Sequence, residues 1–131
     1  IEIYKKAGLT KDQHGELRDY CRSKGIIFLT SVFNEQDVDW LSCLDLAAIK
    51  VPSHEVYNHS LIKKLDGKFE SIFVSAGAAT WEEVEKIPSL ITQSNLSLFH
   101  CVSAYPCPAE NVNLPKIDKL KTLHSSVFNA L

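Results

Sequence analysis

The sequence lacks the features of several large classes of protein. None of its apolar runs approaches the roughly 20 residues that a membrane-spanning helix needs. It contains neither a G-x-x-x-x-G-K-S/T motif nor a G-x-G-x-x-G motif, so nucleotide binding has no support from a phosphate-binding loop. Lysine and arginine number 14 against 16 aspartates and glutamates, and this near balance provides no basic face for nucleic acid.

Cysteine is sparse and scattered. The four cysteines form neither a C-x-x-C pair nor a dense framework. We therefore predict free thiols in a reduced compartment and a cytoplasmic protein. The composition, 45% hydrophobic and 23% charged over 131 residues, is typical of one globular domain. The sequence has no secretory signal pattern and no initiator methionine, and it reads as a segment of a longer chain.

Helix and strand signals alternate along the chain. Short apolar runs predict strands at 26–30, 47–51, 71–75 and 96–102. The run at 26–30 is almost continuously apolar, which is typical of a strand covered on both faces. Caps and amphipathic stripes predict helices at 10–24, 34–44 and 80–91, the last of these kinked or shortened by Pro88. They also predict a short helix around 61–65 that ends near 66–67, and a last helix that begins at Pro115 and carries Ile117, Leu120 and Leu123. Apolar strands that alternate with helices predict an α/β fold with a parallel sheet, either a doubly wound open sheet or about half of a (β/α)8 TIM barrel.

Polar side chains follow all four predicted strands. In both architectures ligands bind at the carboxyl ends of the strands, which share one edge of the sheet. The pattern therefore predicts an anion site there, with an ordinary set of polar turns as the alternative. The residues concerned are Thr30 and Ser31; Lys50, Ser53 and Glu55; Ser75 and Gly77; and His100, Ser103 and Tyr105.

Lys50 is the most informative of these residues, because it interrupts a strand that is otherwise apolar. Its ammonium group either reaches solvent past the strand end or points into the mouth of the sheet, as a phosphate ligand or a Schiff-base amine. Glu55, close behind it, is either a solvated loop carboxylate or a general acid or base. The histidines show no spacing that matches a zinc site, so no metal ligand is predicted.

Four segments together resemble the sialic acid synthase family, which includes N-acetylneuraminate synthases and their legionaminic, pseudaminic and spore-coat polysaccharide relatives. The segments are FLTSVF at 28–33, IKVPSHE at 49–55, VSAGAAT at 74–80 and HCVSAYP at 100–106. The family fold is a (β/α)8 barrel followed by a small antifreeze-like domain. The resemblance implies that residues 1–131 are part of the catalytic barrel, approximately strands three to six with their flanking helices.

The resemblance implies a role for individual residues. It implies that Lys50 faces phosphoenolpyruvate and that Glu55 is the acid/base group. The remaining assignments are Ser31, Ser53 and Ser75 for the phosphate, and Ser103 with Tyr105 for the sugar. His54 stands where the family usually has glycine.

The implied reaction condenses phosphoenolpyruvate with an N-acetylated sugar, such as N-acetylmannosamine, to form a nine-carbon keto acid and release phosphate. Family members use a divalent metal, Mn or Mg, but their two histidine ligands have no match in this chain. The segment alone is therefore expected to be inactive. The alternatives are another phosphoenolpyruvate-dependent aldol synthase, or a non-catalytic truncated fragment. Because a partial barrel leaves strand edges unpaired, we also expect a homo-oligomer.

Overall fold

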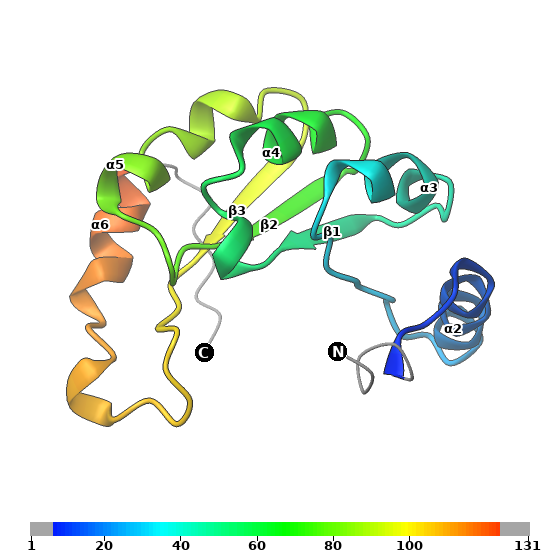
Figure 1. The fold of residues 1–131 in the computed structure, drawn as a ribbon, viewed down its shortest axis with the longest axis horizontal. Helices are drawn as coiled ribbons and strands as arrows, with labels where there is room; N and C mark the ends of the chain where they lie inside the picture. Colours follow the sequence, from blue (N-terminus) through cyan, green and yellow to red (C-terminus); the bar gives the residue numbers. More distant parts are fainter. Residues whose placement is uncertain (1–6, 124–131) are drawn as a thin grey trace.

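The computed structural model describes residues 7–123 and has a parallel sheet at its centre (Figure 1). Three strands lie in the order β1 (Ala48–Val51), β2 (Ser71–Ser75) and β3 (Asn95–Phe99). Both pairs are parallel, and Phe73 of β2 is in register with Lys50 of β1 and with Ser97 of β3. The α/β class predicted from the sequence is therefore confirmed.

Helices connect and flank the strands. In Figure 1, α3, α4 and α5 lie along one side of the sheet, whereas α2 and α6 lie at opposite ends of the molecule. The α-helices are α2 (Lys11–Ser23), α3 (Val38–Ser42), α4 (His59–Leu65), α5 (Trp81–Val84) and α6 (Pro115–Leu123). Short 3-10 helices are η1 (Glu35–Asp37), η2 (Ser53–Glu55), η3 (Ile87–Leu90) and η4 (Ala109–Asn111).

Local capping sets where several helices begin. Thr10 and Gln13 form a complete capping box at α2, and Thr80 and Glu83 form another at α5. These side chains satisfy backbone N–H groups that the first turn of a helix leaves without partners. The predicted helix at 80–91 is divided into α5 and η3, with Pro88 in the first turn of η3. The predicted shortening by this proline is confirmed.

The two faces of the sheet differ in burial. On the face beneath the helices, alternate strand residues are no more than 1% exposed: Ile49, Val51, Ile72, Val74, Leu96 and Leu98. On the other face Lys50, Phe73 and Phe99 are only partly buried, and the two phenyl rings stack with centroids 5.3 Å apart. Because successive side chains of a strand point to opposite faces, Lys50 belongs to the more open face.

The strand predicted at 26–30 is wrong. Its apolar side chains are largely exposed, with Ile26, Ile27 and Leu29 at 62%, 79% and 42%. Pairing with β1 begins only at the end of the run, where Lys50 N donates to Thr30 O (3.1 Å) and Val32 N donates to Lys50 O (2.9 Å). An apolar run forms a strand only where a neighbour supplies hydrogen bonds along it, and in the described residues β1 starts too late to do so.

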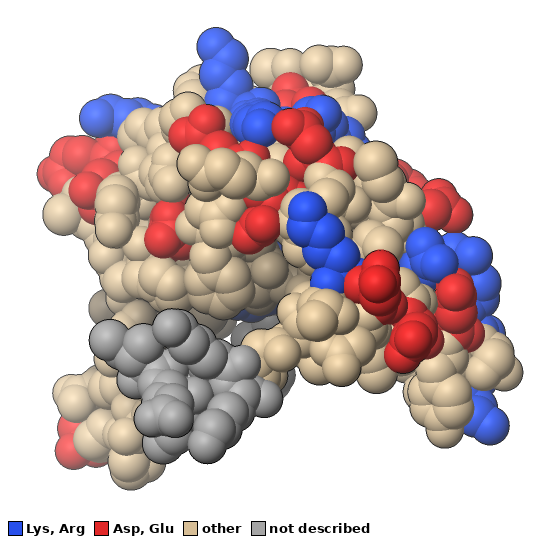
Figure 2. All heavy atoms as spheres, turned by 45° about the vertical axis from the view of Figure 1, so that its right-hand side comes forward, with Lys and Arg blue, Asp and Glu red and all other residues tan. Residues whose placement is uncertain are grey.

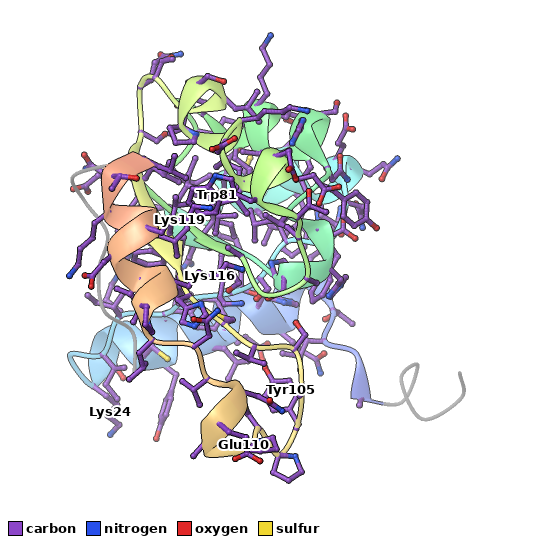
Figure 3. All side chains as sticks on the ribbon, turned by 90° about the vertical axis from the view of Figure 1, so that its left-hand side faces the viewer. Lys24, Trp81, Tyr105, Glu110, Lys116 and Lys119 are labelled. Atoms are coloured by element: carbon purple, nitrogen blue, oxygen red, sulfur yellow. The ribbon has the colours of Figure 1, made fainter. Side chains whose placement is uncertain are left out.

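The strand predicted at 96–102 is too long. β3 ends at Phe99, which is paired with Ser75, the last residue of β2. Beyond this point β2 provides no further partner, so the chain leaves the sheet at His100. The loop that follows carries Tyr105 and Glu110 away from the sheet before α6 begins (Figure 3). The ammonium group of Lys119 on α6 lies 3.8 Å from the centroid of the Trp81 ring on α5, a cation–π contact that joins the two helices.

Charged side chains of both signs are interspersed on the face shown in Figure 2. Lys64 and Lys68 each lie 3.1 Å from the Asp39 carboxylate, linking α4 and the turn after it to α3. The hydrogen bond from Lys64, and to a smaller extent the one from Lys68, lowers the pKa of Asp39 below its ordinary value. Exposed pairs of this kind contribute little to stability.

None of the helices in the described part of the chain is long and apolar enough to cross a membrane.

The turns before β2 and β3 are tied together by one carboxylate. Asp66 Oδ2 accepts hydrogen bonds from Thr92 N (2.9 Å) and Thr92 Oγ1 (3.0 Å), and Oδ1 accepts from the N–H groups of Gln93 (2.9 Å) and Ser94 (3.0 Å). Burial by itself raises the pKa of Asp66, but these donors outweigh it and lower the pKa to about 2. Gly67 has a φ of +75°, a left-handed backbone conformation that favours glycine at this turn.

We expect Asp66→Ala to lower the free energy of unfolding by about 1–3 kcal/mol, because it leaves three N–H donors without their acceptor. The Asp66 pKa is about 2 in the folded chain against an ordinary 3.8, so its contribution is complete above about pH 4. The contribution is lost as the pH falls through about 2. Urea titrations between pH 2 and 7 measure both effects. Glu16→Ala, at an exposed glutamate, is the control. An equal loss of unfolding free energy in the two variants would contradict the stabilising role of Asp66.

Candidate functional site

A cavity of about 470 Å³ opens at the carboxyl ends of the three strands. This volume lies within the roughly 300–1,000 Å³ that is common for small-molecule sites. Residues from the end of each strand and from the loops that follow surround it. They are Lys50, Pro52, Ser53, His54, Ser75, Ala78, Phe99, Cys101, Ser103 and Tyr105. Five of the seven predicted site residues are among them.

Lys50 is the cation of this cavity. Its backbone is held on both sides, by β2 through the parallel register with Phe73 and by residues 30–32 through two hydrogen bonds. The strand geometry places its side chain on the partly buried face of the sheet, at the cavity wall. Ser53 follows as the first residue of η2, directly after Pro52 ends the strand. A short, well-anchored segment thus delivers both groups to the cavity.

Ser75, at the end of β2, and Ser103, in the loop after β3, line the same cavity. Ser75 is the last residue of β2 and is 2% exposed. Ser103 lies close by because Gly77 lets the two loops approach: a Cβ at Gly77 would lie 2.9 Å from Ser103 Oγ and 3.0 Å from Cys101 O. Any larger residue at position 77 would push the loops apart. The small-residue turn seen in the sequence therefore has a packing role at the cavity.

Tyr105 forms the outer part of the wall. Its side chain is 92% exposed, and it precedes a cis peptide bond to Pro106. Figure 3 shows it on the loop between β3 and η4, on the same excursion as Glu110. A phenol in this position is available to a ligand that extends out of the cavity.

Two predicted residues, Ser31 and Glu55, do not line the cavity. Ser31 is adjacent to it through its backbone bridge to Lys50. Glu55 is the last residue of η2, and its Oε2 accepts a hydrogen bond from Asn58 Nδ2 (3.0 Å). Asn58 also caps α4, since its Oδ1 accepts from Leu61 N (3.2 Å). The Glu55 carboxylate is thus held by the residue that caps α4, and in sequence Glu55 directly follows the cavity residue His54.

His54 is a cavity residue that sequence reasoning did not select. Its ring lies at the cavity wall and stacks on the exposed ring of Phe33, with centroids 5.6 Å apart and an interplanar angle of 29°. In the sequence, the position of His54 between the two predicted site residues Ser53 and Glu55 could have indicated that it belongs to the site.

The residues described do not fit a metal centre. Among residues 7–123, no group of three or more His, Cys, Asp or Glu side chains is arranged to hold a metal ion. His100, the strand-end histidine, donates from Nε2 to Val112 O (2.6 Å) and so supports the loop before α6. No step of the chemistry below is therefore assigned to a metal, and the divalent metal of the family stays a prediction for the whole protein.

The wall of hydroxyls around one lysine, at the carboxyl edge of a parallel sheet, agrees with the comparison to known proteins. A family model described as the NeuB family matches residues 1–128. The chain belongs to the NeuB family. The resemblance to sialic acid synthases drawn from four short segments is confirmed, and the three strands with their helices correspond to part of the (β/α)8 barrel of this family.

Relatives in the NeuB family are considerably longer. N,N'-diacetyllegionaminic acid synthase of Campylobacter jejuni is 31% identical over 126 residues, which cover 92% of this chain and 38% of that protein. N-acetylneuraminate-9-phosphate synthase of Drosophila melanogaster is 31% identical over 121 residues, or 90% of this chain and 32% of that protein. This chain therefore spans between about a third and two fifths of these relatives.

A solved structure gives the same result. The N-acetylneuraminic acid synthetase of Leptospira borgpetersenii, determined in complex with citrate, superposes with a TM-score of 0.86 at 26% identity. The superposition covers 94% of this chain and 44% of that one.

Proposed function

We propose that the protein carrying this chain condenses phosphoenolpyruvate with an N-acetylated sugar to make a sialic-acid-type nine-carbon keto acid. One observation carries the proposal: Lys50 and the hydroxyl groups of Ser53, Ser75 and Ser103 surround a single cavity at the carboxyl edge of the sheet. An ammonium group with several hydroxyl donors suits a phosphate ester. The names of the relatives support the product class, since they make legionaminic and neuraminic acids or their phosphates.

The proposed reaction balances without a redox partner. The enol carbon of phosphoenolpyruvate bonds to the aldehyde carbon of the sugar, and the aldehyde oxygen takes a proton to become a hydroxyl. Water adds to the cation left at the phosphate-bearing carbon and loses a proton. The bond from that carbon to the phosphate oxygen then breaks, with its electron pair going to the phosphate, while the new hydroxyl loses its proton to become the keto oxygen; inorganic phosphate, which takes up a proton, and the keto acid are released.

The residues take separate parts in this scheme. Lys50, Ser53 and Ser75 hold the phosphate, and Ser31 lies beside them because it is bridged to Lys50 in the sheet. Tyr105, at the outer wall, contacts the sugar together with Ser103. Glu55 transfers the proton, either to the aldehyde oxygen or from the attacking water. The family's other sugars differ in their substituents, so the class of sugar is proposed here and its identity is left open.

Compartment and assembly are also proposals. All four cysteines are free thiols, which supports a reducing, cytoplasmic location. The homo-oligomer expected from unpaired strand edges stays a prediction.

Binding of inorganic phosphate and of phosphoenolpyruvate to the chain, measured by calorimetry, tests the anion site. Lys50→Met should weaken both by roughly 10- to 100-fold, because a charged hydrogen bond contributes about 1.5–3 kcal/mol. Ser53→Ala and Ser75→Ala should each cost about 0.5–1.5 kcal/mol, the range for a neutral hydrogen bond. Ser31→Ala should cost less, since Ser31 is not among the residues that line the cavity.

Lys86→Met, an exposed lysine after α5, is the matched control and should bind like the unaltered chain. Unchanged affinity in Lys50→Met and in both serine variants would refute the phosphate site.

A further inference from the structure

The cavity has a second nitrogen-bearing side chain besides Lys50. His54 lies at the same wall as Lys50, Ser53 and Ser75, although it is on the surface of the molecule. It follows Ser53 within η2, so its backbone is held by the same short turn that ends β1. The imidazole is thus placed at the mouth of the cavity by an element that also places a proposed phosphate ligand.

The ring of His54 stacks on the ring of a neighbouring residue, Phe33. Phe33 comes from a different segment, directly after the residues that pair with β1, and its ring stacks on His54 at 5.6 Å and 29°. Stacking uses the face of an imidazole ring. The N–H groups lie in the ring plane, at the edge, so the stacking contact leaves them available as hydrogen-bond donors.

The pairing places an aromatic ring against the imidazole at the cavity mouth. Phe33 is 52% exposed, and its ring packs on that of His54. An ordered imidazole beside a lysine and several hydroxyls is a suitable donor to a multiply charged oxyanion, because hydrogen bonds to charged acceptors are the stronger ones.

We propose that His54 donates a hydrogen bond to the phosphate group bound in the Lys50 cavity, and that Phe33 is a positioning residue that holds the imidazole for this contact. The inference rests on the proposed function, since it takes the phosphate site as given. It adds a ligand from this chain that neither the strand-end pattern nor the family resemblance assigned.

Inorganic phosphate is the probe for the test, titrated into the full 131-residue chain by calorimetry and by NMR of the histidine ring protons. His54→Ala should weaken phosphate binding by about 2- to 10-fold, as expected for one hydrogen bond. His54→Gln, which keeps an N–H donor, should recover part of the loss. Phe33→Leu should weaken binding less than His54→Ala and should broaden or shift the His54 ring signals in the free protein.

The ring signal that is missing from His54→Ala identifies His54, and it should move when phosphate is added to the unaltered chain. His14→Ala is the matched control, since this histidine also packs against an aromatic ring, that of Trp40 on α3, but does not line the cavity. Its phosphate affinity should be unchanged.

The outcomes separate the two proposals. If phosphate binds and Lys50→Met weakens it, but His54→Ala binds equally well or more tightly, the role of His54 is overturned while the phosphate site stands. If the unaltered chain does not bind phosphate, both proposals are overturned.

Discussion

Glu55→Gln should lower the turnover of the whole protein that carries this chain by about 10²–10⁴-fold, the usual contribution of a general acid or base. Glutamine keeps the shape of the side chain, and its carbonyl oxygen can still accept the hydrogen bond that Asn58 donates to Glu55. The start of α4 and the neighbouring cavity wall should therefore be preserved. What is lost is the group that gains and loses a proton.

The kinetic pattern distinguishes this role from a binding role. Phosphoenolpyruvate affinity, measured by calorimetry, should stay close to that of the unaltered protein, because its phosphate is assigned to Lys50, Ser53 and Ser75 and not to Glu55. Glu82→Gln, an exposed carboxylate in the first turn of α5, is the matched control and should turn over normally. Near-normal turnover by Glu55→Gln would remove this residue from the mechanism.

Ile72→Ala should lower the free energy of unfolding by about 2–5 kcal/mol, the range for truncating a large buried aliphatic side chain. Ile72 is in the central strand, has 0% of its surface exposed, and is in register with Ile49 of β1 and Leu96 of β3. Alanine would leave a cavity bounded by both neighbours and by the helices above the sheet. Denaturant unfolding followed by circular dichroism measures the change.

A graded series strengthens this test. Ile72→Val removes one methylene and should cost about 0.5–1.5 kcal/mol. Ile27→Ala makes the alanine substitution at an isoleucine that is 79% exposed, so its cost in this chain should be close to zero. Equal losses of unfolding free energy in Ile27→Ala and Ile72→Ala would contradict the claim that burial of Ile72 stabilises the fold.

Features that depend on near neighbours in the chain were determined by the sequence itself. The strand at 71–75 has the predicted bounds, the last helix begins at Pro115 as predicted, and both predicted capping boxes form. Pro88 shortens its helix as expected. These features follow from hydrogen bonds within about four residues and from the apolar period of each segment, which any reader of the sequence can see. The four family motifs likewise identified the family before any coordinates.

Only the tertiary structure decided which of the candidate residues share a site. The run at 26–30 has a strand-like composition, yet it pairs with β1 only from Thr30 onward. The meeting of Ser103 with the loop after β2 depends on Gly77, and the ring of His54 stacks on that of Phe33, about 20 residues earlier in the sequence. Contacts of this kind depend on how distant segments pack, and no local pattern records that packing. For this reason the sequence predicted the edge of the sheet where the site lies, whereas the fold selected the side chains that form its wall.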